Sequence, residues 1–316
     1  MLNILGLVVL IVVAALLAWS SVRALRNENR LLKWGGAGSA GLLAAMTFVV
    51  IVLLSAGLLK LNARTVATPN LRVAGTADQI QRGRAIADSY CGACHSRTGT
   101  LTGGEDIGKH LPVPVGSLVS SNLTPAGRLS HWSDGEIFRA IRNGVDANGR
   151  WLIMMSYTNA GKLSDDDIQA VIAYIRSQSA AGEMMPEPPD HLNPLGLIML
   201  GAGLLPGPKP MMNGVINAPP KSPGAEYGEY ILSYQDCRVC HGANLMGGVQ
   251  GQLGPIGPSL TLVKDWKLEE FISTMRTGID PAGHEVGKQM PWQPIGKMDD
   301  EELAAIYEYL IHLPGS

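Results

Sequence analysis

The stretches Cys91-Gly-Ala-Cys94-His95 and Cys237-Arg-Val-Cys240-His241 decide the fold, and together they use all 4 cysteines of the chain. Two cysteines three positions apart, followed directly by a histidine, form the pattern that attaches haem c. The two thiols lie on one helical turn and can bond the two vinyl groups of one haem, while the histidine reaches the iron. The sequence therefore predicts two covalently bound haem c groups, one held by Cys91, Cys94 and His95 and one by Cys237, Cys240 and His241.

Three other uses of paired cysteines fit this sequence less well. A zinc site takes its four ligands from two C-x-x-C pairs, but it does not require a histidine after each pair. A thioredoxin-like redox motif needs a βαβ setting, which the sequence does not indicate. Structural disulfides would not need the repeated C-x-x-C-H spacing. The repetition of the whole motif favours haem attachment.

The segments that follow the two motifs align with each other. Trp132 begins the aligned part of the first copy, and Trp266 begins that of the second. The stretches SDGEIFRAIRN and KLEEFISTMRT come next and carry apolar residues at helical spacing. Each copy closes with a further predicted helix, for which Ser164 and Asp299 are the N-caps and acidic residues fill the first turn. The chain therefore contains an internal repeat.

The repeat also selects one methionine in each copy. Met155 and Met290 each lie seven residues before a matched lysine, whereas Met154 breaks that offset. A thioether is a soft ligand, and together with histidine it raises the potential of a haem iron. We therefore predict two pairs of iron ligands, His95 with Met155 and His241 with Met290.

Other side chains compete for these positions. The chain has 13 methionines, and most methionines fill gaps in hydrophobic cores. Met246 and Met298 are expected to pack in this way. His131 and His284 are rival ligands, but neither has a counterpart in the other copy of the repeat.

Two long apolar segments precede the repeats. Residues 1–22 and 34–59 carry no charge, and each run exceeds the roughly 20 residues that cross a bilayer as a helix. Short basic loops stay in the cytoplasm, which places both haem motifs on the far side of the membrane. A cleaved signal peptide would carry its positive charges before the apolar run. We predict an uncleaved hairpin over residues 1–64, with spans at about 2–22 and 36–59, and a connecting loop that contains Arg23, Arg26, Arg30 and Lys33.

Residues 181–224 hold ten of the 20 prolines of the chain. This composition predicts a semi-stiff connector between the two repeats. Its apolar run at 195–205 is too short to span a bilayer. We expect the run to pack over one haem domain or between the two, and a position at the membrane surface is the alternative.

The overall composition excludes other classes of protein. Charged residues make up 16% of the chain and the net charge is −2, which argues against a disordered chain and against a nucleic-acid binder. Aromatic residues make up only 5%, which is thin for large self-sufficient cores. A buried haem would supply the apolar surface that such small domains lack.

On these motifs the chain resembles membrane-anchored dihaem cytochromes c built from two class I cytochrome c domains. The resemblance implies a mainly α fold, in which the transmembrane hairpin is followed by cytochrome c domain 1 at 76–180, the Pro-rich linker at 181–224 and cytochrome c domain 2 at 225–316. In that family the helix that carries the motif crosses a C-terminal helix at a contact between a glycine and an aromatic residue. The matching pairs here are Gly83 with Tyr174 and Gly228 with Tyr309.

The resemblance also implies how each motif histidine is oriented. In the family a backbone carbonyl, often of proline, accepts a hydrogen bond from the ring. Pro258 matches this role for His241, while Pro112 and Pro114 both remain candidates for His95. The first domain departs from the second here, because 60 residues separate its histidine and methionine against 49 in the second, with the surplus around residues 104–121.

A six-coordinate iron has no open position for a substrate, so the sequence predicts an electron-transfer protein rather than an enzyme. The chain would carry electrons between a quinol-oxidising complex or dehydrogenase and a terminal acceptor such as an oxidase. We expect a multi-pass protein of the bacterial cell membrane, with its haem domains on the periplasmic side. Expected partners are membrane lipid and redox proteins of a respiratory or photosynthetic complex, without nucleic acid.

Two further likenesses bear on the partner. The layout is similar to that of the dihaem subunit of cbb3-type oxidases, and residues 121–125 (SNLTP) resemble the S-N-[IL]-T-P stretch of cytochrome subunits attached to membrane dehydrogenases. The alternative function is a dihaem peroxidase or reductase with one open iron. Met155 is the weaker of the two methionine assignments, so the first haem would be the open one.

Overall fold

The computed structural model describes all residues except 1, 186–188, 206, 208, 253–254 and 315–316. Small parts of the predicted linker and of the second repeat therefore lie outside the described residues. The chain forms two compact units. The first, here called the hairpin unit, contains Met1–Thr65, Asp106–Leu118 and Asp190–Pro208. The second, here called the repeat unit, contains Val66–Glu105, Val119–Pro189 and Lys209–Ser316.

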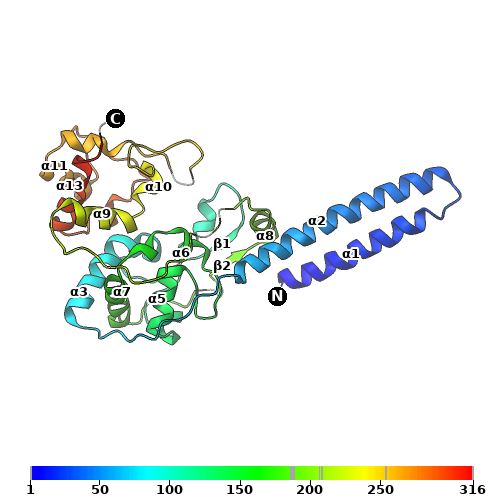
Figure 1. Ribbon diagram of the computed structural model, residues 1–316, viewed down its shortest axis with the longest axis horizontal. Coiled ribbons are helices and arrows are strands. Elements are labelled where there is room, and N and C mark those ends of the chain that lie inside the picture. Colours follow the sequence, from blue (N-terminus) through cyan, green and yellow to red (C-terminus); the bar gives the residue numbers. More distant parts are fainter. Residues whose placement is uncertain (1, 186–188, 206, 208, 253–254, 315–316) are drawn as a thin grey trace. The chain divides into compact units, whose positions relative to one another are not determined.

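Two long helices dominate the hairpin unit. Helices α1 (Leu2–Ala24) and α2 (Ala37–Asn62) run side by side, and a π-helical turn at Leu32–Gly36 leads into α2 (Figure 1). The segments Leu5–Ala24 and Leu32–Leu61 are long and apolar enough to cross a membrane. The two predicted apolar helices are present close to their expected bounds.

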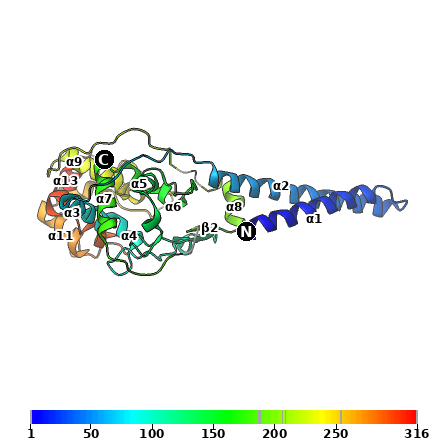
Figure 2. The same cartoon turned by 90° about the horizontal axis from the view of Figure 1, so that it is seen from below.

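The rest of the hairpin unit comes from two distant segments. A 3-10 turn, η3 (Ile107–His110), leads to strand β1 (Gly116–Leu118), which pairs antiparallel with β2 (Asp190–Leu192). Helix α8 (Pro194–Gly201) follows β2 and lies beside the end of α2 (Figure 2). The surplus of the first repeat is therefore built into the hairpin unit.

The position of α8 corrects the expectation for the linker. The apolar run at 195–205 was expected on a haem domain, but α8 packs against α2 instead. Glycines permit this contact, because a Cβ on Gly57 would lie 2.2 Å from the carbonyl oxygen of Leu197. The linker is not extended throughout, since it contains a strand and a helix.

The repeat unit contains the two copies of the repeat in matching order. The main helices of the first copy are α3 (Ala77–Ile86), α4 (Gly92–His95), α5 (Asp134–Asn143), α6 (Ile153–Tyr157) and α7 (Asp165–Ser177). Those of the second are α9 (Ala225–Tyr234), α10 (Cys237–His241), α11 (Leu268–Thr277), α12 (Trp292–Ile295) and α13 (Asp300–Ile311).

Shorter turns complete the two copies. They are the π-helical turn η2 (Ala87–Cys91) and the 3-10 turns η4 (Arg128–His131), η5 (Ala160–Lys162) and η6 (Leu260–Asp265).

Local sequence signals explain where these helices begin and end. The Ser164 hydroxyl accepts a hydrogen bond from the backbone N–H of Asp167, and the Asp299 carboxylate accepts one from the N–H of Glu302. Both predicted N-caps are thus confirmed. The two aligned stretches form α5 and α11, and each helix ends at a glycine in the left-handed conformation, at φ 62° for Gly144 and 72° for Gly278.

Close helix crossings organise each copy around its motif. A Cβ on Gly83 of α3 would lie 1.9 Å from the carbonyl oxygen of Ala170 and 2.9 Å from the Cβ of Tyr174, so the expected contact with Tyr174 is confirmed. In the second copy a Cβ on Gly228 of α9 would lie 1.9 Å from the carbonyl oxygen of Ala305, one turn before Tyr309. Only glycine allows backbones to approach this closely.

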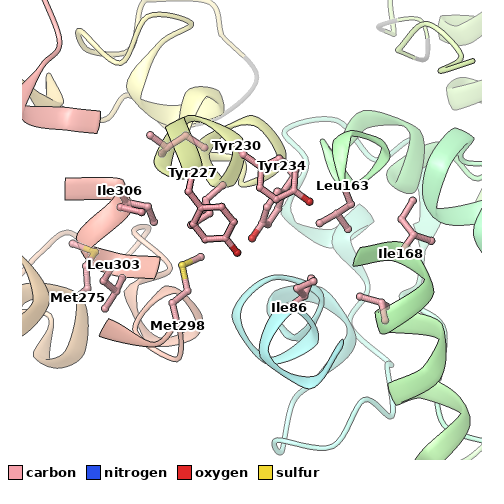
Figure 3. Close-up of a cluster of buried hydrophobic side chains, with 14 of the residues drawn as sticks. Ile86, Leu163, Ile168, Tyr227, Tyr230, Tyr234, Met275, Met298, Leu303 and Ile306 are labelled. Atoms are coloured by element: carbon pink, nitrogen blue, oxygen red, sulfur yellow. The ribbon is translucent and has the colours of Figure 1, made fainter. Parts of the chain in front are cut away.

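The largest hydrophobic cluster described contains side chains of both copies. Figure 3 shows three tyrosines of α9 between Ile86 and Ile168 of the first copy and side chains of α13. The cluster is continuous from Ile137 in the first copy to Leu310 in the second. Such a shared core holds the two copies as one body, which the sequence did not indicate. The three tyrosines are Tyr227, Tyr230 and Tyr234.

Candidate functional site

The two C-x-x-C-H motifs lie at the ends of crossing helices. Cys91 ends the π-helical turn η2 after α3, and α4 carries Cys94 and His95. The second motif forms α10, shortly after α9. No disulfide joins any of the four cysteines. Within the described part of the chain, no group of three or more His, Cys, Asp or Glu residues gathers as a zinc site would require.

The buried surroundings of Cys91 and Cys237 favour an uncharged form of the sulfur atom. Burial raises the pKa of Cys91 to about 12, and burial together with the neighbouring Asp236 carboxylate raises that of Cys237 to about 12. A thiolate is therefore disfavoured at both positions. A thioether carries no charge, so these sites fit a sulfur bonded to a haem vinyl carbon.

Each motif histidine is oriented through its Nδ1 atom. Nδ1 of His241 lies 2.7 Å from the carbonyl oxygen of Pro258, as expected. Nδ1 of His95 lies 2.8 Å from the carbonyl oxygen of Ser121. Because a carbonyl only accepts, each Nδ1 carries the proton, and each Nε2 keeps a lone pair for a metal. Burial also lowers the pKa of His95, which keeps that ring neutral. Both histidines therefore fit the role of haem ligands.

The Ser121 contact corrects the expectation for the first copy. Pro112 and Pro114 were the candidates, but both belong to the segment that folds with the hairpin unit. Ser121-Asn-Leu-Thr occupies the place of Pro258-Ser-Leu-Thr, and the shared Leu-Thr could have identified it. The carbonyl comes 26 residues after the histidine in the first copy and 17 after it in the second. The difference of nine residues reflects the segment built into the hairpin unit.

The two selected methionines lie at matching places in the fold. Met155 lies within α6 and Met290 two residues before the start of α12, and both side chains are half-buried. Met298 is 1% exposed in the shared core, so its expected packing role is confirmed. The rival residues His131 and His284 are both exposed. Iron ligation by Met155 and Met290 stays a prediction.

A hydrogen bond joins the residues that precede the two motifs. The Tyr90 hydroxyl, next to Cys91, donates to Oδ2 of Asp236, next to Cys237, at 3.0 Å. Burial raises the pKa of both Tyr90 and Asp236. The charge of Asp236 raises the pKa of Tyr90 further, whereas the hydrogen bond from Tyr90 opposes the rise in the pKa of Asp236. Asn159 donates to Oδ1 of Asp236 through its backbone N–H at 3.2 Å and its side-chain amide at 2.7 Å. The first copy therefore supplies three donors to one carboxylate of the second.

A second polar contact links the copies through Arg82 of α3. The guanidinium donates to both carboxylate oxygens of Asp167, at 2.7 and 2.9 Å, and also to Glu302 of α13. The Tyr230 hydroxyl donates to the same Asp167 carboxylate. Burial alone would lower the pKa of Arg82, but Asp167 raises it above the ordinary arginine value. Sequence reasoning identified none of these interface residues, because they belong to contacts between repeats rather than to the repeated pattern.

The family comparisons match both copies of the repeat. Residues 78–175 match the model of cytochrome c oxidase, cbb3-type, subunit III, and residues 225–314 match the model of cytochrome c. The first match runs from α3 to α7 and the second from α9 to α13, so each contains one C-x-x-C-H motif and one glycine crossing.

Comparison with curated proteins gives relatives from dehydrogenase systems. A nicotinate dehydrogenase subunit of Pseudomonas putida is 27% identical over 267 residues, 76% of this chain and 22% of that protein. The fructose dehydrogenase cytochrome subunit of Gluconobacter japonicus is 30% identical over 42% of this chain and 27% of its own length. The alcohol dehydrogenase (quinone) cytochrome c subunit of Gluconobacter oxydans is 26% identical over 64% of this chain and 43% of its own length.

The chain spans less than half the length of each of these relatives. Two of them are named as cytochrome subunits of dehydrogenases, which agrees with the match of this chain to the cytochrome c family models. The apolar helices α1 and α2 support membrane anchoring. The chain therefore contains two tandem cytochrome c domains, which imply two covalently bound haem c groups, and two apolar helices long enough to cross a membrane precede them.

Proposed function

We propose that this chain is the membrane-bound dihaem subunit through which a dehydrogenase passes electrons toward a terminal acceptor such as an oxidase. The observation that carries the proposal is the Tyr90–Asp236 hydrogen bond, because it ties together the residues next to the two haem-attaching cysteines. Two haem motifs held in one body suit a relay, in which an electron enters at one haem and leaves from the other. Bound haem supplies the one-electron redox chemistry, and the protein sets potential, spacing and docking.

The proposed haem sites use matching residues. Cys91 and Cys94 hold one haem and Cys237 and Cys240 the other, with His95 and His241 as the ligands on the motif side. Met155 and Met290 are the proposed ligands on the opposite side. The carbonyls that fix Nδ1 of each histidine support this assignment, since ligating histidines are normally oriented in this way. Two protein ligands at each iron favour a carrier over the peroxidase or reductase alternative.

The names of the relatives support a dehydrogenase as the electron donor. Two relatives are named as cytochrome subunits of fructose and alcohol dehydrogenases, and the likeness covers 42% and 64% of this chain. By analogy with these names, a separate catalytic subunit would supply the electrons here. Identification of that catalytic subunit would also identify the respiratory or photosynthetic complex to which we assign the chain.

We further propose a bacterial inner-membrane topology for the chain. The basic residues between α1 and α2 favour a cytoplasmic loop, so both helices cross the membrane and the two haem domains are periplasmic. The proposed boundaries are 1–64 for the hairpin, 76–180 and 225–316 for the haem domains, and 181–224 for the linker. The segment Asp106–Leu118 is an insertion of the first haem domain that folds with the hairpin unit.

Flash photoreduction of the purified holoprotein tests the relay. A photoexcited dye delivers less than one electron per molecule, and absorbance changes follow its redistribution between the two haems. A redistribution rate independent of protein concentration is expected for transfer within one molecule. A rate proportional to concentration would mean that the haems exchange electrons only between molecules, which would contradict the relay.

A further inference from the structure

Helix α8 is apolar on all sides and yet partly exposed. Residues 193–208 carry no charged side chain, and α8 itself reads PLGLIMLG. Leu195 is 44% exposed and Leu204, just after the helix, is 69% exposed. A helix that is apolar all round is found inside a protein core or in a membrane. The exposed side chains of this segment therefore lack the apolar surroundings that their chemistry requires.

The contacts of α8 place it beside the apolar part of α2. A Cβ on Gly201 would lie 2.0 Å from the carbonyl oxygen of Leu53, and one on Gly57 would lie 2.2 Å from that of Leu197. Leu53 lies seven residues before Lys60, the basic residue in the last turn of α2. At 1.5 Å per residue, Leu53 lies about 10 Å along the helix from Lys60, on the side of the apolar span.

The polar groups at both ends of α8 are satisfied within the unit. Asn193 accepts from the backbone N–H of Gly196 at 2.9 Å, and its amide donates to the carbonyl of Pro114. At the other end the Lys60 ammonium donates to the carbonyl of Leu200 at 2.8 Å and to that of Gly201 at 3.2 Å. Backbone groups at membrane depth must find partners inside the protein, since lipid offers none.

The inserted segment of the first haem domain also contacts α8. A Cβ on Gly196 would lie 2.2 Å from the carbonyl oxygen of Val115, and β1 pairs with β2 just before the helix. The second repeat has no equivalent segment. The insertion therefore fastens α8 at a fixed height on α2.

We propose that α8 and the turn after it, residues 194–205, lie in the periplasmic leaflet of the bilayer, with Leu195 and Leu204 against lipid acyl chains. The exposed apolar surface of α8 continues that of α2, and this continuity identifies lipid as the occupant. The inference rests on the proposed crossing of the membrane by α2. It gives the linker a function, because a segment that enters the leaflet fixes the chain at a defined depth next to the insertion.

Depth-dependent fluorescence quenching tests this position in the full holoprotein. Because haem attachment uses the native cysteines, a single introduced cysteine is the only free thiol for a bimane label. The test positions are Leu204→Cys after α8, Met46→Cys in α2, and Val249→Cys in the second haem domain, which are 69%, 59% and 65% exposed. Each labelled protein is reconstituted in nanodiscs of plain phosphatidylcholine or of lipid brominated near the headgroup or near the chain end.

The expected pattern separates the two proposals. Bromines near the headgroup should quench the label at Leu204 at least twofold, bromines near the chain end should quench the label at Met46, and neither lipid should affect the label at Val249. If Met46 is quenched while Leu204 behaves like Val249, the position of α8 is wrong and the membrane anchor stands. If Met46 also escapes quenching, the anchor itself is wrong, and the inference about α8 falls with it.

Discussion

Tyr90 and Asp236 occupy the same place in the two repeats, directly before the first cysteine of each motif, and their side chains are hydrogen-bonded at 3.0 Å. The two copies of the repeat therefore contact each other next to their C-x-x-C-H motifs. Asp236 also accepts two hydrogen bonds from Asn159, whose side-chain oxygen accepts from Lys209 at 2.6 Å. This small network fixes the two haem motifs relative to each other without using any atom of the haem sites.

Removal of the Tyr90 hydroxyl should weaken this junction. Tyr90→Phe leaves a buried carboxylate oxygen with one donor fewer, and hydrogen bonds to charged groups contribute about 1.5–3 kcal/mol. We expect a loss of that size in the unfolding free energy from guanidinium denaturation, and slower electron redistribution between the haems after a flash. Tyr174→Phe is the matched control, because among the described residues its hydroxyl makes no hydrogen bond. Equal stability of the two variants would show that the Tyr90 contact contributes nothing.

The Asp236 carboxyl should make the unfolding free energy depend on pH. Burial raises its pKa above the ordinary 3.8, although Tyr90, Lys209 and Asn159 oppose the shift. A raised pKa in the folded state means that this contribution is complete below about pH 3.8 and is lost as the pH rises through the folded pKa. Asp236→Asn removes that loss, so the stability of the variant relative to the native chain should increase from pH 4 to pH 7.

The slope of this difference is the test, because the amide also changes the hydrogen bonding by a pH-independent amount. Asp106→Asn gives a comparison of opposite sign. Hydrogen bonds from Leu118, Ser117 and Gly108 outweigh desolvation and lower the pKa of Asp106. The unfolding free energy of Asp106→Asn, relative to that of the native chain, should therefore fall as the pH rises. Parallel curves for Asp236→Asn and the native chain would contradict the account of Asp236.

The Arg82 ion pairs should be far more sensitive than an exposed pair on the same helix. The side chains of Asp167 and Glu302 are 9% and 3% exposed, so Arg82→Met leaves two buried carboxylates without their cation. Breaking a buried pair in this way costs about 3–5 kcal/mol. Arg84→Met on α3 removes a pair with Asp88 in which Arg84 is 70% exposed, and it should cost below about 1 kcal/mol.

Thermal denaturation of the two holoproteins checks this difference, and limited proteolysis between the haem domains reports whether they separate. Similar melting temperatures for Arg82→Met and Arg84→Met would rule out a stabilising role for the contact between α3 and α13.

The glycine crossing of the second haem domain should not tolerate a methyl group. Gly228→Ala places a Cβ 1.9 Å from the carbonyl oxygen of Ala305, so α9 and α13 must move apart. Overpacking of this kind costs about 1–3 kcal/mol or more. Gly287→Ala is the control in the same domain, since a Cβ there meets nothing within 4 Å. The yield of folded holoprotein and its melting temperature should fall for Gly228→Ala alone, and an equal fall in both variants would count against the crossing.

Local patterns in the sequence predicted the main helices of the two repeats. They did not predict the contacts between segments that are far apart in the sequence. Helical spacing and capping residues predicted α5, α11 and the starts of α7 and α13. The orienting proline of the second motif, Pro258, was also predicted. Ser121 was missed because an insertion shifts its position and because any residue can offer a backbone carbonyl.

The position of α8 and the shared core were missed for a different reason. An apolar run of eleven residues has no marker that distinguishes a haem domain from α2 as its support, and the decisive contacts are backbone approaches at Gly57 and Gly201. Likewise, the tyrosines of α9 suit the core of a single domain as well as one shared by two. Periodicity reports which face of a helix is buried but not which element buries it.

We predict that two protein ligands coordinate each haem iron, His95 with Met155 and His241 with Met290. An optical redox titration of the detergent-solubilised holoprotein, followed by addition of carbon monoxide to the reduced form, tests it most directly. We expect two c-type haems, methionine-to-iron charge-transfer absorption in the oxidised protein, and no carbon monoxide complex at either haem. Met155→Ala and Met290→Ala should each open one haem to carbon monoxide and lower its potential. Rapid binding of carbon monoxide by the native protein would contradict the claim and favour the peroxidase or reductase function.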